Sequence, residues 1–268
     1  MKKYIVIGNP IKHSLSPLLH NYWIKKNKIN AVYEKKLVEE NQIKGVVLKI
    51  KNGEINGANV TIPFKTKIVP FLDKLTDEAE ETKSVNTVYF ENGEVIGHNT
   101  DIAGFELGIR HFKYDVKNKK VFINGAGGVV PSIIVALKKM GALKIFLYNR
   151  TLDKAKDLQN NFREVEIINR KEIPSDIDML INASSLGLKK SDKINLDYKS
   201  IGSNKFFYDV IYNPIETNFL KKGKEFGNRT ENGKMMFIYQ AHQSFVLWHK
   251  ILPKIDDNII ELLNIWLE

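Results

Sequence analysis

The chain alternates short apolar runs with segments in which apolar residues recur at helical spacing. This alternation continues almost from end to end, and it predicts α/β architecture with mainly parallel sheets. In the first third we expect strands at 4–9, 31–37, 57–61, 87–91 and 95–97. Asn92-Gly93 lies between the last two strands and predicts a hairpin turn. Ser16 and Pro17 predict an N-cap and a first helical position, for a helix that ends near Lys28.

A second series of elements begins near residue 102 and suits a nucleotide-binding sheet. We expect helices at 102–112, 129–140 and 152–162, and strands at 120–124, 144–149, 165–168, 179–182 and 206–210. Two further helices, 234–250 and from Asp256 to Glu268, have no strand to cover in this second sheet. We therefore expect them to pack back on the first domain. The predicted domains are 1–101 for substrate, 102–236 for cofactor, and 237–268 for the returning helices; 268 residues are long for a single core.

Composition narrows the class of protein. The net charge of +10 suggests the hypothesis that the protein binds nucleic acid. The lysines, however, are spread along the chain among acidic residues, which is typical of a solvated surface. No apolar run approaches the roughly 20 residues that cross a bilayer, and the apolar N-terminus suits a first strand better than a signal peptide. The chain has no cysteine, which excludes disulfides and thiolate chemistry. We expect a cytoplasmic protein that binds neither nucleic acid nor membrane.

The most informative motif is Val121-Phe-Ile-Asn-Gly-Ala-Gly-Gly128, an apolar run that ends in closely spaced glycines before a helix. Gly125 permits a tight turn, while Gly127 and Gly128 let the backbone approach a pyrophosphate at a helix N-terminus. Val130 stands where Gly or Ala would pack most closely, and Pro131 falls in the tolerated first helical turn. The alternative is a glycine-rich turn that binds nothing, because the motif has meaning only between a strand and a helix.

The end of the following strand discriminates between the two nicotinamide dinucleotides. NAD sites usually carry an acidic residue there for the ribose 2′-hydroxyl, whereas NADP sites carry a cation. Here Asn149 is followed by Arg150, Thr151 and, one helical turn later, Lys154, with no acid at the strand end. This pattern favours NADP.

Polar residues in the first domain cluster after predicted strands, where open α/β sheets bind ligands. Ser14 and Ser16 stand beside a helix N-terminus, which suits a carboxylate; the alternative is a capping serine and a loop serine. Lys65 and Asp101 would form a proton-handling pair if the fold brings them together. Lysine has an unperturbed pKa of about 10.4, and a neighbouring carboxylate would keep it charged and able to protonate a developing alkoxide. The alternatives are an exposed lysine and an aspartate N-cap.

Other catalytic classes are not favoured. The six histidines show no metal-ligand spacing, so we expect no metal site. There is no Gly-x-Ser-x-Gly elbow and no Gly-Lys-Ser/Thr phosphate loop.

Nine sequence blocks, in order along nearly the whole chain, together resemble the shikimate dehydrogenase family, NADP-dependent enzymes of aromatic amino-acid synthesis. The blocks are Gly8-Asn-Pro-Ile-Lys-His-Ser-Leu-Ser-Pro17, Asn59-Val-Thr-Ile-Pro-Phe-Lys65, Ser84-Val-Asn-Thr87, Gly97-His-Asn-Thr-Asp101, Asn124-Gly-Ala-Gly-Gly128, Asn149-Arg-Thr151, Ile181-Asn-Ala-Ser-Ser-Leu-Gly187, Asp209-Val-Ile-Tyr-Asn-Pro214 and Gln240-Ala-His-Gln-Ser-Phe245. Val129-Val130 and Lys154 depart from the usual pattern, which has smaller residues after the glycines and frequently an arginine at the latter position.

The resemblance implies reversible reduction of 3-dehydroshikimate to shikimate, with a hydride from NADPH. It assigns Lys65 as the acid–base residue and Asp101 as its partner beside the reacting oxygen. It implies a substrate site of Ser14, Ser16 and Tyr212 for the carboxylate, and Thr61, Asn86 and Gln240 for the ring hydroxyls. It implies a cofactor site of Gly125, Ala126, Gly127, Gly128 and Val129 at the pyrophosphate, Asn149, Arg150, Thr151 and Lys154 at the 2′-phosphorylated ribose, Val210 and Gly233 at the nicotinamide, and Asp77 from the first domain.

Several alternatives stay open from the residues alone. The nearest alternative is a quinate/shikimate dehydrogenase that accepts NAD as well, and a related sugar-acid or aminoshikimate dehydrogenase is another. A non-catalytic nucleotide sensor with this fold, and a basic interaction module, belong to other classes. The sequence predicts a monomer or a homodimer that acts on a small-molecule substrate.

Overall fold

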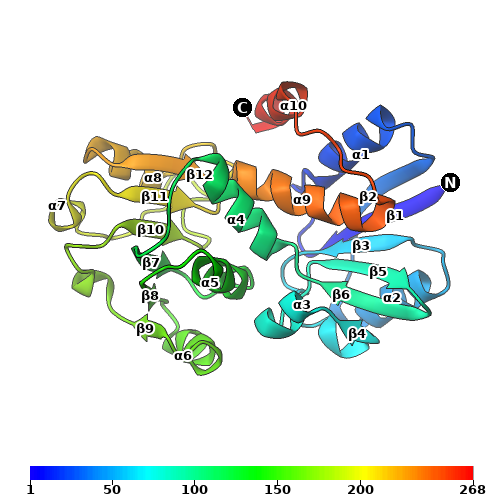
Figure 1. Cartoon of the computed structure of the whole chain (residues 1–268), viewed down its shortest axis with the longest axis horizontal. Helices are drawn as coiled ribbons and strands as arrows, with labels where there is room; N and C mark the ends of the chain where they lie inside the picture. Colours follow the sequence, from blue (N-terminus) through cyan, green and yellow to red (C-terminus); the bar gives the residue numbers. More distant parts are fainter. Residues whose placement is uncertain (268) are drawn as a thin grey trace. The chain divides into compact units, whose positions relative to one another are not determined.

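The computed structural model describes residues 1–267, which divide into two compact units. Unit 1 comprises Met1–Gly104 and Ile238–Trp266, and unit 2 comprises Phe105–Phe237 and Leu267 (Figure 1). We keep the domain boundaries after residues 101 and 236 as a proposal. No helix in the described part of the chain is long and apolar enough to span a membrane.

Unit 1 contains a six-stranded sheet in the order β2-β1-β3-β5-β6-β4. The strands are β1 (Lys2–Gly8), β2 (Ala31–Leu37), β3 (Gly57–Val60), β4 (Lys74–Leu75), β5 (Thr87–Glu91) and β6 (Glu94–His98). Only β5 runs against its neighbours, and β1 is parallel to both β2 and β3. The predicted hairpin is confirmed: Asn92 and Gly93 adopt φ of 53° and 86° between β5 and β6. These positive φ angles are what a tight two-residue turn requires.

The helices of unit 1 cover both faces of this sheet. They are α1 (Ser16–Lys26), α2 (Ile43–Lys51), α3 (Asp77–Thr82), α10 (Asp257–Leu267), the start of α4 (Asp101–His111), most of α9 (Lys234–His249), and the 3₁₀ turns η1 (Glu40–Gln42) and η2 (Val69–Phe71). The α2 side chains of Ile43, Val46 and Ile50 join the apolar core with Val60. On α9, the indole of Trp248 lies so close to the sheet that a Cβ on Gly57 would stand 2.5 Å from it. This contact confirms the expected return of the C-terminal helices (Figure 1).

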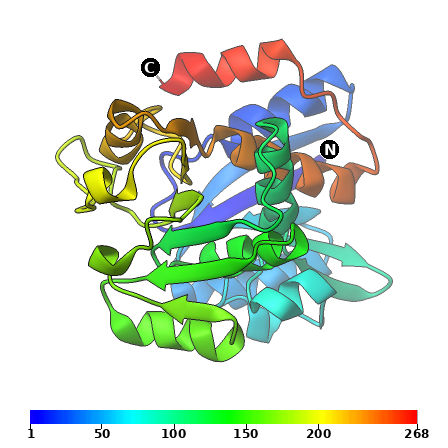
Figure 2. The same cartoon turned by 60° about the vertical axis from the view of Figure 1, so that its left-hand side comes forward.

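Unit 2 contains a fully parallel six-stranded sheet in the order β12-β11-β10-β7-β8-β9. The strands are β7 (Lys120–Asn124), β8 (Lys144–Tyr148), β9 (Val165–Ile167), β10 (Met179–Asn182), β11 (Phe206–Asp209) and β12 (Arg229–Asn232), and the green ones run side by side in one direction in Figure 2. The helices are most of α4, α5 (Val130–Lys139), α6 (Leu152–Asn161), α7 (Tyr198–Ile201), α8 (Asn218–Glu225) and the 3₁₀ turn η3 (Arg170–Glu172). The chain order reverses between β7 and β10. Such a switch point is where open α/β sheets bind ligands.

The expected α/β class with two sheets is confirmed, and several local predictions are wrong. Ser16 is the first residue of α1 rather than its N-cap, which is Leu15; the Ser14 hydroxyl instead accepts from the Ser16 N–H at 3.4 Å. The same helix stops at Lys26, and Lys28 has a φ of 52°. The alternative for Asp101, that it is an N-cap, does not hold, because Asp101 is the first residue of α4 and its backbone N–H donates to the Asn99 side chain at 3.0 Å. The predicted end of the last helix at Glu268 falls outside the described residues.

Candidate active site and nucleotide site

Lys65 and Asp101 form an ion pair in unit 1, between the Lys65 Nζ and the Asp101 Oδ2. Lys65 lies in the turn after β3, where its carbonyl accepts from Val85 N at 2.8 Å. The two side chains retain only 13% and 7% of their exposure, so the pair is nearly desolvated. The second carboxylate oxygen of Asp101, Oδ1, accepts from the Asn86 amide at 3.0 Å. The geometry therefore holds an ammonium group next to a carboxylate whose orientation is fixed.

Asn86 connects this pair with α9 and with the end of β6. Its side-chain oxygen accepts from Thr100 N at 2.8 Å, and its amide nitrogen lies 3.4 Å from the Gln240 side-chain oxygen. Asn86 is 2% exposed. The structure thus brings together four of the residues singled out from the sequence: Lys65, Asn86, Asp101 and Gln240.

Ser14 and Thr61 belong to the turns that follow β1 and β3, and Ser16 is the first residue of α1. The Ser14 hydroxyl donates to the Ser16 hydroxyl at 3.3 Å beside the first turn of α1. Thr61 follows β3, and its N–H donates to Ile7 O at 2.9 Å. Because β1 and β3 are parallel neighbours, these turns leave the same edge of the sheet. Two hydroxyls beside a helix N-terminus are suited to an anionic group.

Asn59 is a polar residue of this unit for which sequence reasoning gave no role. It is buried in β3, accepts from the Tyr33 hydroxyl at 2.6 Å, and donates to Thr87 at 3.1 Å and to Ser244 at 3.0 Å. The signal in the sequence was a polar residue within an otherwise apolar strand. Such a residue has to be hydrogen-bonded, because an unpaired buried amide is costly.

In unit 2 the glycine turn connects β7 to α5, as its motif predicts. Gly125 has a φ of 125°, and a Cβ there would lie 2.7 Å from the Ala183 backbone. This residue is glycine because the protein's own packing requires it. At Gly127 a Cβ would approach only the Ala183 carbonyl, at 3.8 Å, and at Gly128 it would meet nothing within 4 Å. The space over these two glycines, at the start of α5, is open to a ligand, and a pyrophosphate fits such a cradle.

The end of β8 presents cations without acidic partners. Arg150, Thr151 and Lys154 are exposed, and no described residue forms an ion pair with either cation. The Asn149 amide donates to Thr151 O at 2.8 Å, which shapes the turn into α6. An additional phosphate would therefore find two positive charges here.

Val210 and Gly233 lie together near Tyr212, because Gly233 N donates to Ile211 O at 3.2 Å, whereas Asp77 belongs to unit 1. A Cβ on Gly233 would stand 2.0 Å from Val210 O, so only glycine permits this approach of two backbone segments. Tyr212 stacks on Phe237 with ring centroids 4.7 Å apart, and burial raises the pKa of Tyr212 to about 12. Asp77 is exposed in the first turn of α3, and its side chain makes no hydrogen bond or ion pair with residues of the described chain.

A chain of buried polar groups that the sequence did not reveal crosses the carboxyl edge of this sheet. Asn124 donates to the Asn182 side-chain oxygen at 3.1 Å, and Asn182 donates to Asp209 at 3.0 Å. Asp209 also accepts from the Thr217 hydroxyl at 2.6 Å and from Ile211 N at 3.0 Å. Burial raises the pKa of Asp209 to about 6, against the opposing effect of these hydrogen bonds.

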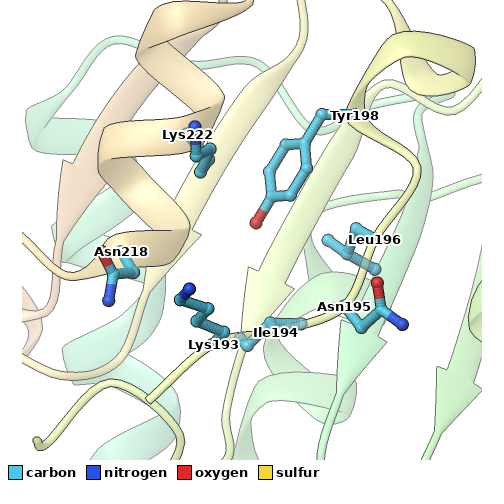
Figure 3. Close-up of a pocket in the computed structure, with 7 residues that line it drawn as sticks. All are labelled: Lys193, Ile194, Asn195, Leu196, Tyr198, Asn218 and Lys222. Atoms are coloured by element: carbon cyan, nitrogen blue, oxygen red, sulfur yellow. The ribbon is translucent and has the colours of Figure 1, made fainter. Parts of the chain in front are cut away.

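A cavity of about 380 Å³ opens elsewhere in unit 2, between α8 and the segment before α7 (Figure 3). It is lined by Lys193, Ile194, Asn195, Leu196, Tyr198, Asn218 and Lys222. The Tyr198 hydroxyl points into this space. None of the residues predicted from the sequence lines this cavity.

A nearly buried lysine–aspartate pair in one α/β unit, and a strand–glycine turn–helix with neighbouring cations in a parallel sheet of the other, define a nucleotide-dependent oxidoreductase of the Rossmann type. Residues 6–88 match the family model described as the shikimate dehydrogenase substrate binding domain. Residues 106–190 match the model described as shikimate / quinate 5-dehydrogenase.

Relatives and solved structures match almost the whole chain. The shikimate dehydrogenase (NADP(+)) of Pelagibacter ubique is 56% identical over 264 residues, which cover 98% of this chain and 99% of the relative. The crystal structure of shikimate dehydrogenase from Aquifex aeolicus is 37% identical, with a TM-score of 0.90 over 97% of this chain and 96% of that one. The Thermus thermophilus enzyme in complex with NADP(H) and shikimate is 27% identical, with a TM-score of 0.91 over 100% of both chains. The chain belongs to the shikimate dehydrogenase family.

Proposed function

We propose that this chain is an NADP-dependent shikimate dehydrogenase, which reversibly reduces the ketone of 3-dehydroshikimate to the alcohol of shikimate. The observation that carries the proposal is the ion pair of Lys65 with Asp101. Reduction of a ketone produces an alkoxide, which needs a proton donor held in a fixed position. A lysine beside a fixed carboxylate meets that requirement.

The remaining polar groups of unit 1 orient the substrate. Ser14 and Ser16 donate to its carboxylate, and we retain Tyr212 as a further donor to the same group. Thr61, Asn86 and Gln240 hold the ring hydroxyls. Lys65 protonates the reacting oxygen during reduction, and Asp101 holds the ammonium group in place. Orientation of this kind supplies much of the rate enhancement, because the reacting atoms are held at attack distance.

Unit 2 holds the coenzyme. When bound, NADPH supplies the hydride, so the protein contributes only binding, orientation and the proton. The pyrophosphate is cradled by backbone atoms of Gly125, Ala126, Gly127, Gly128 and Val129. The adenosine ribose and its 2′-phosphate are bound by Asn149, Arg150, Thr151 and Lys154. Val210 and Gly233 flank the nicotinamide, and we retain Asp77 as a further cofactor-binding residue.

One spectrophotometric experiment tests the activity and separates its alternatives. Absorbance at 340 nm is followed with shikimate and with quinate, each with NADP and with NAD. We expect turnover with shikimate and NADP, and a kcat/KM for NAD at least about 10-fold lower, because Arg150 and Lys154 favour a phosphate. Equal kcat/KM values for the two coenzymes would favour a shikimate dehydrogenase that also uses NAD. No turnover with any pair would favour the nucleotide-sensing alternative.

The setting of the reaction is also part of the proposal. A small-molecule substrate is the partner that this activity requires, and we retain the prediction that nucleic acid is not one. We likewise retain a cytoplasmic location and a monomeric or homodimeric state as proposals. Size-exclusion chromatography with light scattering measures the last of these.

A further inference from the structure

Arg170, in the 3₁₀ turn after β9, is held in place by two neighbouring strands. Its guanidinium carbon lies 4.3 Å from the centre of the Tyr148 ring, and its Nε donates to the Asn124 side-chain oxygen at 3.0 Å. Asn124 is the last residue of β7 and Tyr148 the last residue of β8. Stacking on one side and a hydrogen bond on the other fix the guanidinium plane at the carboxyl edge of the sheet.

The terminal nitrogens of this guanidinium have no protein acceptor. Within residues 1–267, no carboxylate pairs with Arg170, and its only hydrogen bond is the one from Nε. A guanidinium carries five N–H donors, and four of them are on the two terminal nitrogens. Arg170 is half-buried, and burial lowers the pKa of its guanidinium. A partly desolvated cation, fixed in orientation and without an anion, is suited to an anion from outside the chain.

The position of Arg170 indicates which anion this is. Its two supports, Asn124 and Tyr148, immediately precede Gly125 and Asn149, where the two segments proposed for the dinucleotide begin. Gly125 N also donates to Tyr148 O at 2.7 Å. This hydrogen bond joins the ends of β7 and β8 at the point where the two proposed dinucleotide-binding segments begin. A dinucleotide carries phosphates on the adenosine side of this sheet and no other anionic group.

We propose that Arg170 binds a phosphate of the dinucleotide through its terminal nitrogens. The proposal rests on the proposed function, since it presumes a dinucleotide in unit 2. Two phosphates share this chemistry: the pyrophosphate, which NADP and NAD have in common, and the 2′-phosphate, which only NADP carries. Arginine is better suited to either than lysine, because its planar fork binds two phosphate oxygens at once.

Direct binding measurements test the proposal without catalysis. Isothermal titration calorimetry with NADP⁺, NAD⁺ and adenosine 2′,5′-bisphosphate is applied to the unaltered protein and to Arg170→Gln, Arg170→Lys and Lys171→Gln. Lys171 is the matched control, because it is adjacent, exposed and of the same charge. We expect Arg170→Gln to weaken NADP⁺ binding about 10-fold, as loss of a charge-assisted hydrogen bond does, and Arg170→Lys to fall between. Lys171→Gln should stay within about 2-fold, as an exposed charge does.

The outcomes distinguish the two phosphates and refute the idea if it is wrong. A loss confined to NADP⁺ and the bisphosphate assigns the 2′-phosphate, whereas equal losses for NADP⁺ and NAD⁺ assign the pyrophosphate. Unchanged affinities in Arg170→Gln overturn the proposal, and so does an equal loss in Lys171→Gln, which would reflect overall charge. If the unaltered protein binds no dinucleotide, it is the proposed function that fails. An unaltered far-ultraviolet circular dichroism spectrum of Arg170→Gln separates weaker binding from misfolding; if Arg170→Gln does not fold, Arg170→Lys carries the test.

Discussion

Replacement of Lys65 by alanine is the most direct test of the reaction chemistry. The substitution removes the ammonium group and leaves the Asp101 carboxylate, 7% exposed, with the Asn86 amide as the donor that remains to it. Two consequences follow from one structural fact. The proposed proton donor is lost, and a nearly buried charge loses its partner.

Both consequences have expected magnitudes. Loss of general acid–base assistance lowers rates by about 10²–10⁴-fold. Because Lys65 is not assigned to ground-state binding, the KM for shikimate should change by less than about 3-fold. Breaking a buried ion pair from one side costs about 3–5 kcal/mol of folding stability. We expect the lower end here, because Lys65 keeps 13% exposure and Asp101 keeps its bond from Asn86.

The assay compares four proteins by kcat, by KM for shikimate and by urea denaturation. Lys65→Met retains most of the side-chain volume, so it separates loss of charge from loss of packing. Lys67→Ala is the matched control, since Lys67 pairs with Glu40 in a setting where both side chains are exposed. It should keep full turnover and lose less than about 1 kcal/mol. Unchanged kcat in Lys65→Ala would refute the assignment, and a rise in KM at constant kcat would move Lys65 from catalysis to substrate binding.

Further expectations concern unit 2. Gly125→Ala should destabilise the protein by at least about 1 kcal/mol, because φ is 125° and the new Cβ would lie 2.7 Å from the Ala183 backbone. Gly128→Ala meets open space and should leave the denaturation midpoint unchanged while it weakens NADP⁺ binding in calorimetry; a normal NADP⁺ affinity would contradict the cradle. The pKa of Asp209 rises from 3.8 to about 6, so the folded state binds the proton more tightly. The contribution of Asp209 to the free energy of unfolding should therefore be greatest below about pH 4. It should fall by roughly 3 kcal/mol as the pH rises through 6. The free energy of unfolding of Asp209→Asn, measured by urea denaturation, should lack this dependence on pH. An identical pH profile in the unaltered protein and in Asp209→Asn would contradict the raised pKa of Asp209.

Elements with a strong apolar period could be predicted from the sequence, and weakly patterned ones could not. The alternation of apolar strands and helices was sufficient for the α/β class and for most elements of both sheets. β12 reads Arg-Thr-Glu-Asn, and without its parallel pairing to β11 it has no strand signal. α8 contains three lysines and a glycine, so its sequence has a weak apolar pattern. Its few apolar residues are buried because they pack against the sheet of unit 2. Tertiary packing decided these elements, so local propensity was a poor guide.

The candidate active site was predictable where one short block of sequence carries the chemistry. The glycine turn needs only a strand, its glycines and a helix in succession, and these are contiguous. The pairing of Lys65 with Asp101 had to be assumed, because nothing local connects two residues on different turns. The resemblance to a family joined them, and the structure shows the ion pair.

The polar chain in unit 2 shows why the rest needed three dimensions. Asn124, Asn182 and Asp209 each end an apolar strand, and each alone looks like an ordinary transition to a loop. The parallel register aligns Asn182 with both of the others, so three strand ends become one hydrogen-bonded line. Arg170 adds to that line through Asn124 and reaches Tyr148 on the next strand. A cation whose neighbours come from two other strands carries no signal in its own stretch of sequence, and its role depends on the register that brings those strand ends together.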